Sequence, residues 1–525
     1  MYNPARMATR SWWYLAPCLV AAILVASHTP VGAALSMDSL SYLSTANNIL
    51  DGKGIVHNTF ALSGPAVEAT TVWPPLYAVL LAPITWLASL AGISDVFGIA
   101  VFNVFALVVS MYLVLRIASL TSSIWAGIFV AFAIAISPSL QIVFTYAWSE
   151  VVFIPLSLAA YLCLQRYLMD DSGDGRRGLY AVVLLLGLAT YTRYVGLAFF
   201  SAAALALLLY GRGSPTERLR TATVATLAYL AILAPLLLRN LVLSGSLSGG
   251  DRGMPDTSLR ADVATLMWYL YLEFLNLPVV AVAVLAIVTV VTIAWLLFRQ
   301  SNASARARSS SYSTIVVPFL FAFSYMIFLL LSRSRQTIDL DTRMLSVAVP
   351  FLLIGLLGVY QQLSMRTRTS LALLPFLLPA CAFAINAINT HASILKGWHE
   401  VGEPGSVLGL TYRSMTGRQL DSLRGIKEHF PPNAGDLVLT DITRPIVVGY
   451  LFPSSDVRQI ANEANELNFA ALDTLLHRQG IAIIGSTAWS QTLARGLEGR
   501  ASFYKTDGRT GGPEFIVIKL PVDAP

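Results

Sequence analysis

The first side chain able to do chemistry in this sequence is the carboxylate of Asp38. It lies in the run MDSLSYLSTA at residues 37–46, where the first long apolar segment would leave a membrane. A charged group is costly inside hydrocarbon, so an acid at such a position is a candidate functional residue. Because a carboxylate can take a proton from an attacking hydroxyl, we predict that Asp38 is a catalytic base. The alternative is that Asp38 only caps the following helix, since Asp is a favoured N-cap residue.

A second acid and several arginines stand at other expected helix ends. Glu150 follows Ser149 at the start of an apolar segment, and Arg193 lies in a very short turn between two apolar segments. A later loop holds three arginines and two acids: Arg333, Arg335, Asp339, Asp341 and Arg343. Because a guanidinium matches the geometry of phosphate oxygens, this set predicts a site for an anionic, lipid-anchored substrate.

Each of these residues also has a purely structural interpretation. Glu150 suits a helix start because of capping and the helix dipole. Arg193 can extend to the membrane interface. At least one arginine of the later loop is expected to pair with Asp339 or Asp341.

The composition is that of a polytopic membrane protein. The chain has 525 residues, of which 56% are hydrophobic and 12% charged, against about 25% charged in soluble domains. The net charge of +6 is expected from cytoplasmic loops, so we predict no nucleic-acid partner. All three cysteines, Cys18, Cys163 and Cys381, lie in apolar segments, and we expect no disulfides.

Eleven segments are long and apolar enough to cross a membrane, which takes roughly 20 helical residues. They are 12–34, 95–115, 121–138, 150–168, 179–192, 194–211, 221–239, 277–298, 312–332, 344–363 and 369–389. Residues 74–92 are ambiguous, because this apolar stretch begins with two prolines and contains Pro83. If it does not cross, the inner loops hold 14 cations and the outer connections hold 8. The positive-inside bias favours this arrangement, in which residues 74–92 form a helix along the outer membrane face.

This topology predicts a plasma (inner) membrane protein with a cytoplasmic N-terminus. Residues 1–395 would form the transmembrane domain, with a first outer loop at 35–94. Residues 396–525 are richer in charge and have shorter apolar runs, which predicts an extracytoplasmic α/β domain. Its expected strands are 436–440, 481–485 and 515–519, and its expected helices are 419–430 and 470–479.

Five motifs in order resemble the bacterial dolichyl-phosphate-mannose-protein-mannosyltransferase-like proteins, which are glycosyltransferase family 39 and its relatives, of the GT-C fold. The first is the loop MDSLSYLSTANNILDGKG, which contains Asp38, Tyr42, Ala46, Gly52 and Gly54. The others are Trp73-Pro74-Pro75-Leu76-Tyr77, Ser149-Glu150, Gly187 to Arg193 (GLATYTR), and Asp341-Thr342-Arg343 with Pro350. The resemblance covers roughly residues 12–390 and implies a GT-C helical bundle.

The resemblance implies an inverting transfer of sugar from a polyprenyl-phosphate donor. It implies that Asp38 is the base and that Glu150 is a second acid near acceptor or donor. It implies that outer-loop arginines hold the leaving phosphate, with Arg193 and Arg343 foremost and Arg333 and Arg335 behind them. Tyr42, Trp73 and Tyr77 fall within the motifs and are the other expected substrate-binding residues.

The sequence also departs from the family pattern. Asp38-Ser39 replaces a common Asp-Glu pair, Met344 replaces the usual Tyr after the arginine, and Tyr194-Val195 stands where Pro-Glu is common. The missing second acid weakens any proposal of a metal pair. Since arginines alone can stabilise a leaving phosphate, we predict no metal and no other cofactor.

Two other function classes stay open at this point. A transporter or flippase of a lipid-linked anion would use similar arginines, but more often has inverted repeats and broken helices at mid-membrane. A GT-C-like binding protein without activity is the other alternative. For an enzyme, the acceptor hydroxyl could belong to a glycolipid, a polysaccharide or a protein, and membrane lipid would surround the site.

Overall fold

The fold is known from a computed structural model of the chain. It describes residues 15–29, 32–58, 67–121, 124–169, 176–250, 253, 257–274, 305–335, 340–367, 383–389 and 391–392, together with five strands between 437 and 519. By contacts between Cα atoms the chain divides into two compact units. Unit 1 comprises residues 1–33, 71–77 and 95–395, and unit 2 comprises residues 34–70, 78–94 and 396–525.

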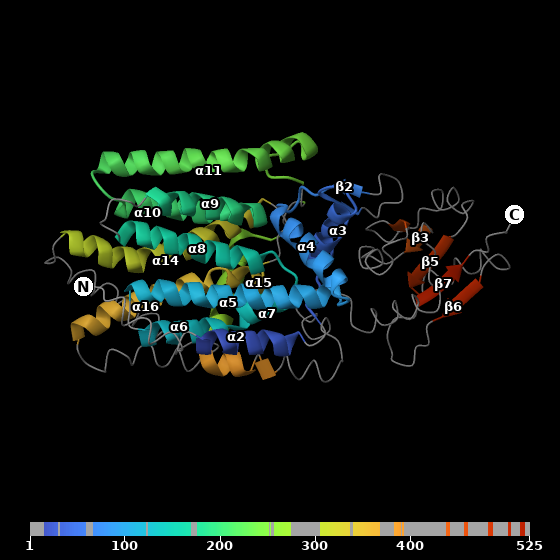
Figure 1. The fold of residues 1–525 in the computed structure, drawn as a ribbon, viewed down its shortest axis with the longest axis horizontal. Helices are drawn as coiled ribbons and strands as arrows, with labels where there is room; N and C mark the ends of the chain where they lie inside the picture. Colours follow the sequence, from blue (N-terminus) through green and yellow to red (C-terminus); the bar gives the residue numbers. More distant parts are fainter. Residues whose placement is uncertain are drawn as a thin grey trace. The chain divides into compact units, whose positions relative to one another are not determined.

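Unit 1 is a bundle of α-helices, most of which run side by side (Figure 1). Its helices are α2 (Leu15–His28), α5 (Asp95–Thr121), α6 (Ile124–Ala135), α7 (Pro138–Thr145), α8 (Glu150–Met169), α9 (Arg176–Thr192), α10 (Gly196–Tyr210), α11 (Pro215–Ser244), α12 (Leu259–Phe274), α14 (Ala305–Arg333), α15 (Thr342–Ser346) and α16 (Val349–Thr367). Helix α8 packs against α5 and α9, and α14 packs against α10 and α16.

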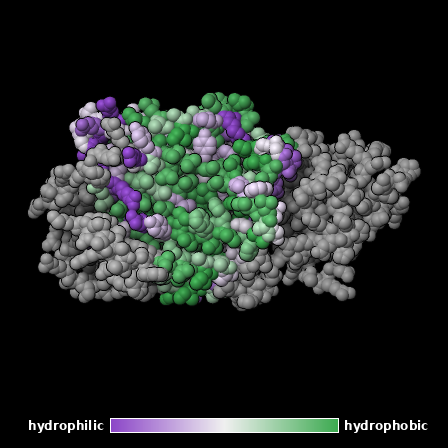
Figure 2. All heavy atoms as spheres, in the orientation of Figure 1, coloured by the Kyte–Doolittle hydropathy of each residue, from purple (hydrophilic) through white to green (hydrophobic). Residues whose placement is uncertain are grey.

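The helices of unit 1 have the length and composition of membrane spans. Within the described residues, four helices are long and apolar enough to cross: α5, α8, α11 and α14. Helices α6 and α7 form a further candidate, bent by 57°. The face of the bundle shown in Figure 2 is largely hydrophobic, as lipid contact requires. The chain is therefore a multi-pass membrane protein, as the composition predicted.

Several predicted spans correspond to helices, but the count of eleven stays a prediction. Residues 277–298 and most of 369–389 lie outside the described part of the chain. Residues 74–92 do form a helix, α4 (Leu76–Leu90), which contains Pro83. Its expected position along the outer membrane face likewise stays a prediction.

An aromatic cluster fills the centre of the bundle. The ring of Phe199 on α10 lies 5.1 Å from Phe321 on α14 and 5.0 Å from Phe351 on α16, between centroids. Tyr161 on α8 makes edge contacts with Phe321 and Phe351. Because all four side chains are buried, this cluster fixes the packing of α8, α10, α14 and α16.

Unit 2 contains α3 (Met37–Leu50), most of α4, a short hairpin and a five-stranded sheet. The hairpin pairs β1 (Val56–Asn58) with β2 (Val67–Ala69) in antiparallel fashion. The sheet has the order β4-β3-β5-β7-β6 and consists of β3 (Leu437–Thr440), β4 (Asp456–Gln459), β5 (Ile481–Ser486), β6 (Ser502–Lys505) and β7 (Phe515–Lys519). Strands β4, β3 and β5 are parallel to one another, β7 is antiparallel to β5, and β6 is antiparallel to β7.

The three strands expected in the tail are present as β3, β5 and β7. Strands β4 and β6 were not expected, because DVRQ and SFYK contain no apolar run. The expected helices at 419–430 and 470–479 lie outside the described residues. The division into domains at residue 395 stays a prediction.

Candidate active site

Three charged residues that are far apart in the sequence meet inside unit 1. Glu150 is the first residue of α8, and Arg193 follows the last residue of α9. Arg343 lies in the five-residue helix α15, whose N-cap is Asp341 through a 3.0 Å bond from the Met344 N–H. Each residue is therefore held at a helix end.

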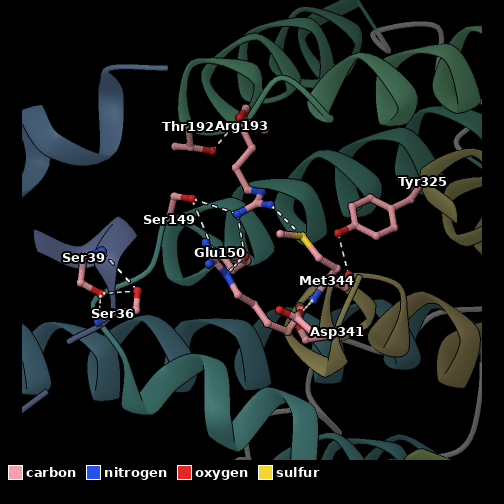
Figure 3. Close-up of polar contacts among 12 residues, drawn as sticks. Ser36, Ser39, Ser149, Glu150, Thr192, Arg193, Tyr325, Asp341 and Met344 are labelled. Carbon is pink, nitrogen blue, oxygen red and sulfur yellow. Dashed lines mark hydrogen bonds and ion pairs between the residues drawn. The ribbon is translucent and has the colours of Figure 1, made fainter. Parts of the chain in front are cut away.

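Both guanidinium groups contact the Glu150 carboxylate, and Figure 3 shows the contact of Arg193. The Nε and Nη2 of Arg343 lie 2.5 Å from Oε1 and 3.2 Å from Oε2 of Glu150, so the pair is bidentate. The Nη1 of Arg193 lies 2.5 Å from Oε1. The Glu150 side chain is fully buried, with 0% exposure. The Arg193 side chain is 14% exposed and pairs with this buried carboxylate. Its interpretation as an interfacial side chain stays open.

A second layer of contacts holds the arginines in place. Arg193 Nη1 also donates to the Ser149 Oγ at 3.1 Å, and its Nη2 lies 3.2 Å from the Met344 sulfur. The Tyr325 hydroxyl on α14 donates to the Met344 carbonyl at 2.6 Å. Met344, which departs from the family pattern, is thus part of the site.

An aromatic ring also packs against the guanidinium group of Arg343. Its guanidinium carbon lies 4.3 Å from the centroid of the Trp148 ring, a cation–π distance. The Trp148 ring stacks on Tyr146 at 4.2 Å with an interplanar angle of 6°. The Trp148 ring therefore supports the Arg343 guanidinium.

Two guanidinium groups meet one carboxylate in this cluster, and a second carboxylate, that of Asp341, caps the helix that carries Arg343. A guanidinium is suited to phosphate, because it presents a planar fork of donors. The arrangement can therefore bind a phosphate that approaches the arginines. We name Glu150, Arg193 and Arg343 the arginine–glutamate cluster.

The other predicted phosphate ligands lie in different surroundings. Arg333, at the end of α14, is buried, and its Nε lies 3.4 Å from Asp262 Oδ1 while its Nη2 lies 3.1 Å from Thr257 Oγ1. Arg335 is exposed. Asp339 lies outside the described residues. The structure thus groups Arg193 with Arg343 and places Arg333 with Asp262.

The expected base belongs to unit 2. Asp38 is half-buried in the first turn of α3. The N-cap of this helix is Ser36, which exchanges hydrogen bonds with Ser39. The interpretation of Asp38 as the cap of its helix is therefore wrong. Its role as base, and its expected grouping with Arg193 and Arg343, stay predictions.

The three expected aromatic residues are largely buried. Tyr42 on α3 and Tyr77 at the start of α4 are 2% and 0% exposed, and Trp73 is half-buried just before α4. Their roles in substrate binding stay predictions.

Some buried polar residues outside the motifs were not anticipated, among them Asp262, Glu273 and Asn103. Each stands in or beside an apolar segment, where a charged or amide side chain needs a partner. A systematic search for polar residues in apolar segments would have found them. The amino-acid sequence does not tell which partners they have.

The likeness of the helical bundle to solved structures shows the class of the fold: it is a GT-C fold, the fold of a group of membrane glycosyltransferases. Among solved structures, the chain is similar to ArnT from Cupriavidus metallidurans bound to undecaprenyl phosphate. The TM-score is 0.61 at 14% identity, over 98% of this chain and 100% of that chain.

Two further structures are similar over most of this chain. The oligosaccharyltransferase of Archaeoglobus fulgidus, in complex with Zn and sulfate, gives a TM-score of 0.50 at 13% identity, over 95% of this chain and 73% of that one. The arabinofuranosyltransferase AftD from Mycobacteria gives 0.50 at 15% identity, over 98% of this chain and 42% of that one. No protein-family model matches the sequence, and a search of the curated proteins finds no match.

Proposed function

We propose that this protein is an inverting glycosyltransferase that moves a sugar from a polyprenyl-phosphate donor to an acceptor hydroxyl on the outer face of the membrane. The observation that carries the proposal is the likeness to ArnT bound to undecaprenyl phosphate, which extends over nearly the full length of both chains. The arginine–glutamate cluster supports it, because it offers two guanidinium groups to a phosphate at the ends of membrane helices.

In the proposed reaction, the acceptor oxygen attacks the anomeric carbon while the bond from that carbon to the phosphate oxygen breaks. The Asp38 carboxylate takes the proton of the acceptor hydroxyl. Arg193 and Arg343 stabilise the charge that develops on the departing polyprenyl phosphate. Glu150 holds the two arginines at a fixed separation and orientation. The acceptor is a glycolipid, a polysaccharide or a protein.

The test is transfer from labelled polyprenyl-phosphate sugars by the full chain in nanodiscs, followed by mass spectrometry of the product. We expect Asp38→Asn to lower the rate by about 10²–10⁴-fold, since it keeps the shape of the side chain and removes its basicity. Asp51→Asn is the matched control, because Asp51 is an exposed acid at the other end of the same helix. Transfer by Asp38→Asn at the wild-type rate would refute the role of Asp38.

The same assay tests the proposed independence from metals. The proposal rests on the arginines, which can stabilise a leaving phosphate without a metal. We expect an excess of a chelator such as EDTA to leave the initial rate unchanged. A rate that falls with EDTA and returns on addition of a divalent cation would contradict this proposal.

One observation favours the transporter alternative. The break between α6 and α7 lies inside a candidate span and has the buried acid Glu273 against it, as in some transporters. Vesicles that contain the purified protein and a labelled lipid-linked sugar separate the two functions. Movement of the label between leaflets without any new glycoside would favour the transporter.

A further inference from the structure

Helix α7 is adjacent to two parts of the arginine–glutamate cluster. It runs over Pro138–Thr145, and only Tyr146 to Ser149 separate its end from Glu150. It also packs against α15, which carries Arg343. A shift of α7 would therefore move both partners of the Glu150–Arg343 ion pair.

The N-terminus of α7 is capped by an acid from a distant helix. The chain breaks after α6, and α7 begins at Pro138, which has no N–H to satisfy. The Ser137 Oγ donates to Glu273 Oε1 at 2.5 Å, and the Ser139 N–H donates to Glu273 Oε2 at 3.2 Å. Glu273 is 2% exposed and stands at the end of α12.

The remaining donors at this end are satisfied locally. The Leu140 N–H donates to the Ser137 Oγ and the Gln141 N–H donates to the Ser137 carbonyl at 2.9 Å. The Gln141 side chain donates to the carbonyl of Ala135, which is the last residue of α6. Inside a membrane such satisfaction is required, because no water replaces a missing partner. The carboxylate also lies at the positive end of the helix dipole.

The C-terminus of α7 is held by a different helix. Asn103 on α5 is fully buried, and its Nδ2 donates to the Phe144 carbonyl at 3.0 Å and to the Tyr146 carbonyl at 2.8 Å. These bonds fix the residues directly before Trp148, whose ring supports Arg343. An eight-residue helix is thus tied at both ends by buried side chains from α12 and α5.

We propose that Glu273 and Asn103 are positioning residues for the arginine–glutamate cluster, acting through α7. They hold α7 so that Glu150, on the chain that follows it, and Arg343, on the helix packed against it, meet in bidentate geometry. The catalytic consequence rests on the proposed function, because a displaced guanidinium stabilises a leaving phosphate less well. The structural consequence does not depend on any activity.

The structural test is hydrogen–deuterium exchange of the full chain in nanodiscs. Glu273→Gln removes the charge and one acceptor, and Ser137→Ala removes the cap without touching Glu273. We expect both to accelerate exchange at residues 139–141 and also at 146–150. Asn103→Ala should accelerate exchange more at residues 146–150 than at residues 139–141. Glu217→Gln is the control, since Glu217 is an exposed capping acid on α11 and should leave both segments unchanged.

The two readouts separate this proposal from the proposed function. Faster exchange that stays confined to 139–141 would show that Glu273 only caps its helix and would overturn the proposal. If the wild type transfers sugar, we expect Glu273→Gln to lower kcat about 10- to 100-fold with KM within about twofold, since small misplacements cost rate. If the wild type transfers no sugar to any acceptor, the proposed function fails, and the exchange result still decides the role of α7.

Discussion

At the scale of single residues, the central feature is a buried carboxylate shared by two guanidinium groups. Taking such charges out of water is costly, and the cost is recovered only when geometry and hydrogen bonding are good. Here the bidentate Arg343 pair, the Arg193 contact, Ser149 and Trp148 supply that geometry. We infer that Glu150 contributes mainly by fixing the arginines rather than by contacting sugar.

Removing Glu150 should therefore destabilise the protein more than removing one arginine. Glu150→Leu leaves one buried and one partly buried guanidinium group without their carboxylate, and we expect a loss of about 3–5 kcal/mol in the free energy of unfolding. Arg343→Met should cost less, because Arg193 still pairs with Glu150. Adding Arg343→Met to Glu150→Leu should recover part of the loss, since one unpaired charge disappears.

Unfolding by SDS in mixed micelles measures all three variants and the coupling between the sites. Glu217→Gln, at an exposed cap, is the control and should cost clearly less. Equal and additive effects of the two single substitutions would show that the ion pair contributes nothing specific.

The types of the cluster residues were predictable, but their grouping was only partly so. Motif order and topology placed Glu150, Arg193 and Arg343 at one membrane face. That Arg343 pairs with Glu150, 193 positions away, while Arg333 pairs with Asp262, depends on how α12, α14 and α15 pack. No local pattern in the sequence contains this information.

At the scale of elements, helix ends explain where the expected spans and the observed helices differ. Helix α11 extends over Pro215–Ser244, beyond the expected 221–239, because a Ser214–Glu217 capping box starts it and Gly245 at φ 72° ends it. Residues 121–138 were expected to be one span. The helix there, α6, ends at Ala135, and the chain continues as α7, which was not expected and whose first turn depends on Glu273 far along the chain.

The helix that carries Asp38 is tied to the β1–β2 hairpin. Asn48 on α3 donates to the Val56 carbonyl at 3.1 Å and to Asn58 Oδ1 at 2.9 Å, and the Asn58 N–H donates to Ser44 Oγ at 3.1 Å. His57, between these residues, lies opposite Glu68 in the hairpin. The hairpin thus stabilises the position of α3.

This hairpin should weaken in acid. Burial lowers the pKa of His57, and the nearby Glu68 carboxylate only partly opposes this shift. Because the folded pKa lies below the unfolded value of 6.5, the unfolded hairpin binds the proton more tightly. The contribution of neutral His57 to the stability of the folded hairpin is therefore complete above pH 6.5 and is lost progressively as the pH falls below it.

Hydrogen–deuterium exchange, corrected for the intrinsic rate, tests this at about pH 7.5 and about pH 5. We expect lower protection of residues 56–58 and 67–69 at the acidic pH. His57→Gln cannot titrate and should show the same protection at both values. If the variant loses protection as the wild type does, another group is responsible.

At the scale of the whole molecule, the distribution of cations along α14 bears on the orientation of the chain. Helix α14 has 29 residues, so it is roughly 44 Å long, which exceeds a hydrocarbon core of about 30 Å. Arg306 and Arg308 lie in its first turn, and Arg333 is its last residue. Each end can therefore extend beyond the hydrocarbon, and charge bias decides which end faces the cytoplasm.

The bias predicts that the Arg308 end is inside. Green fluorescent protein fused after Arg308 should be fluorescent, and alkaline phosphatase at the same site should be inactive, because the first folds in the cytoplasm and the second needs an oxidising compartment. The opposite pattern is expected for fusions after Pro525. An active phosphatase after Arg308 would show that every later loop faces the side opposite to the one predicted. The arginine–glutamate cluster would then face the cytoplasm, where a sugar transfer on the outer surface could not use it.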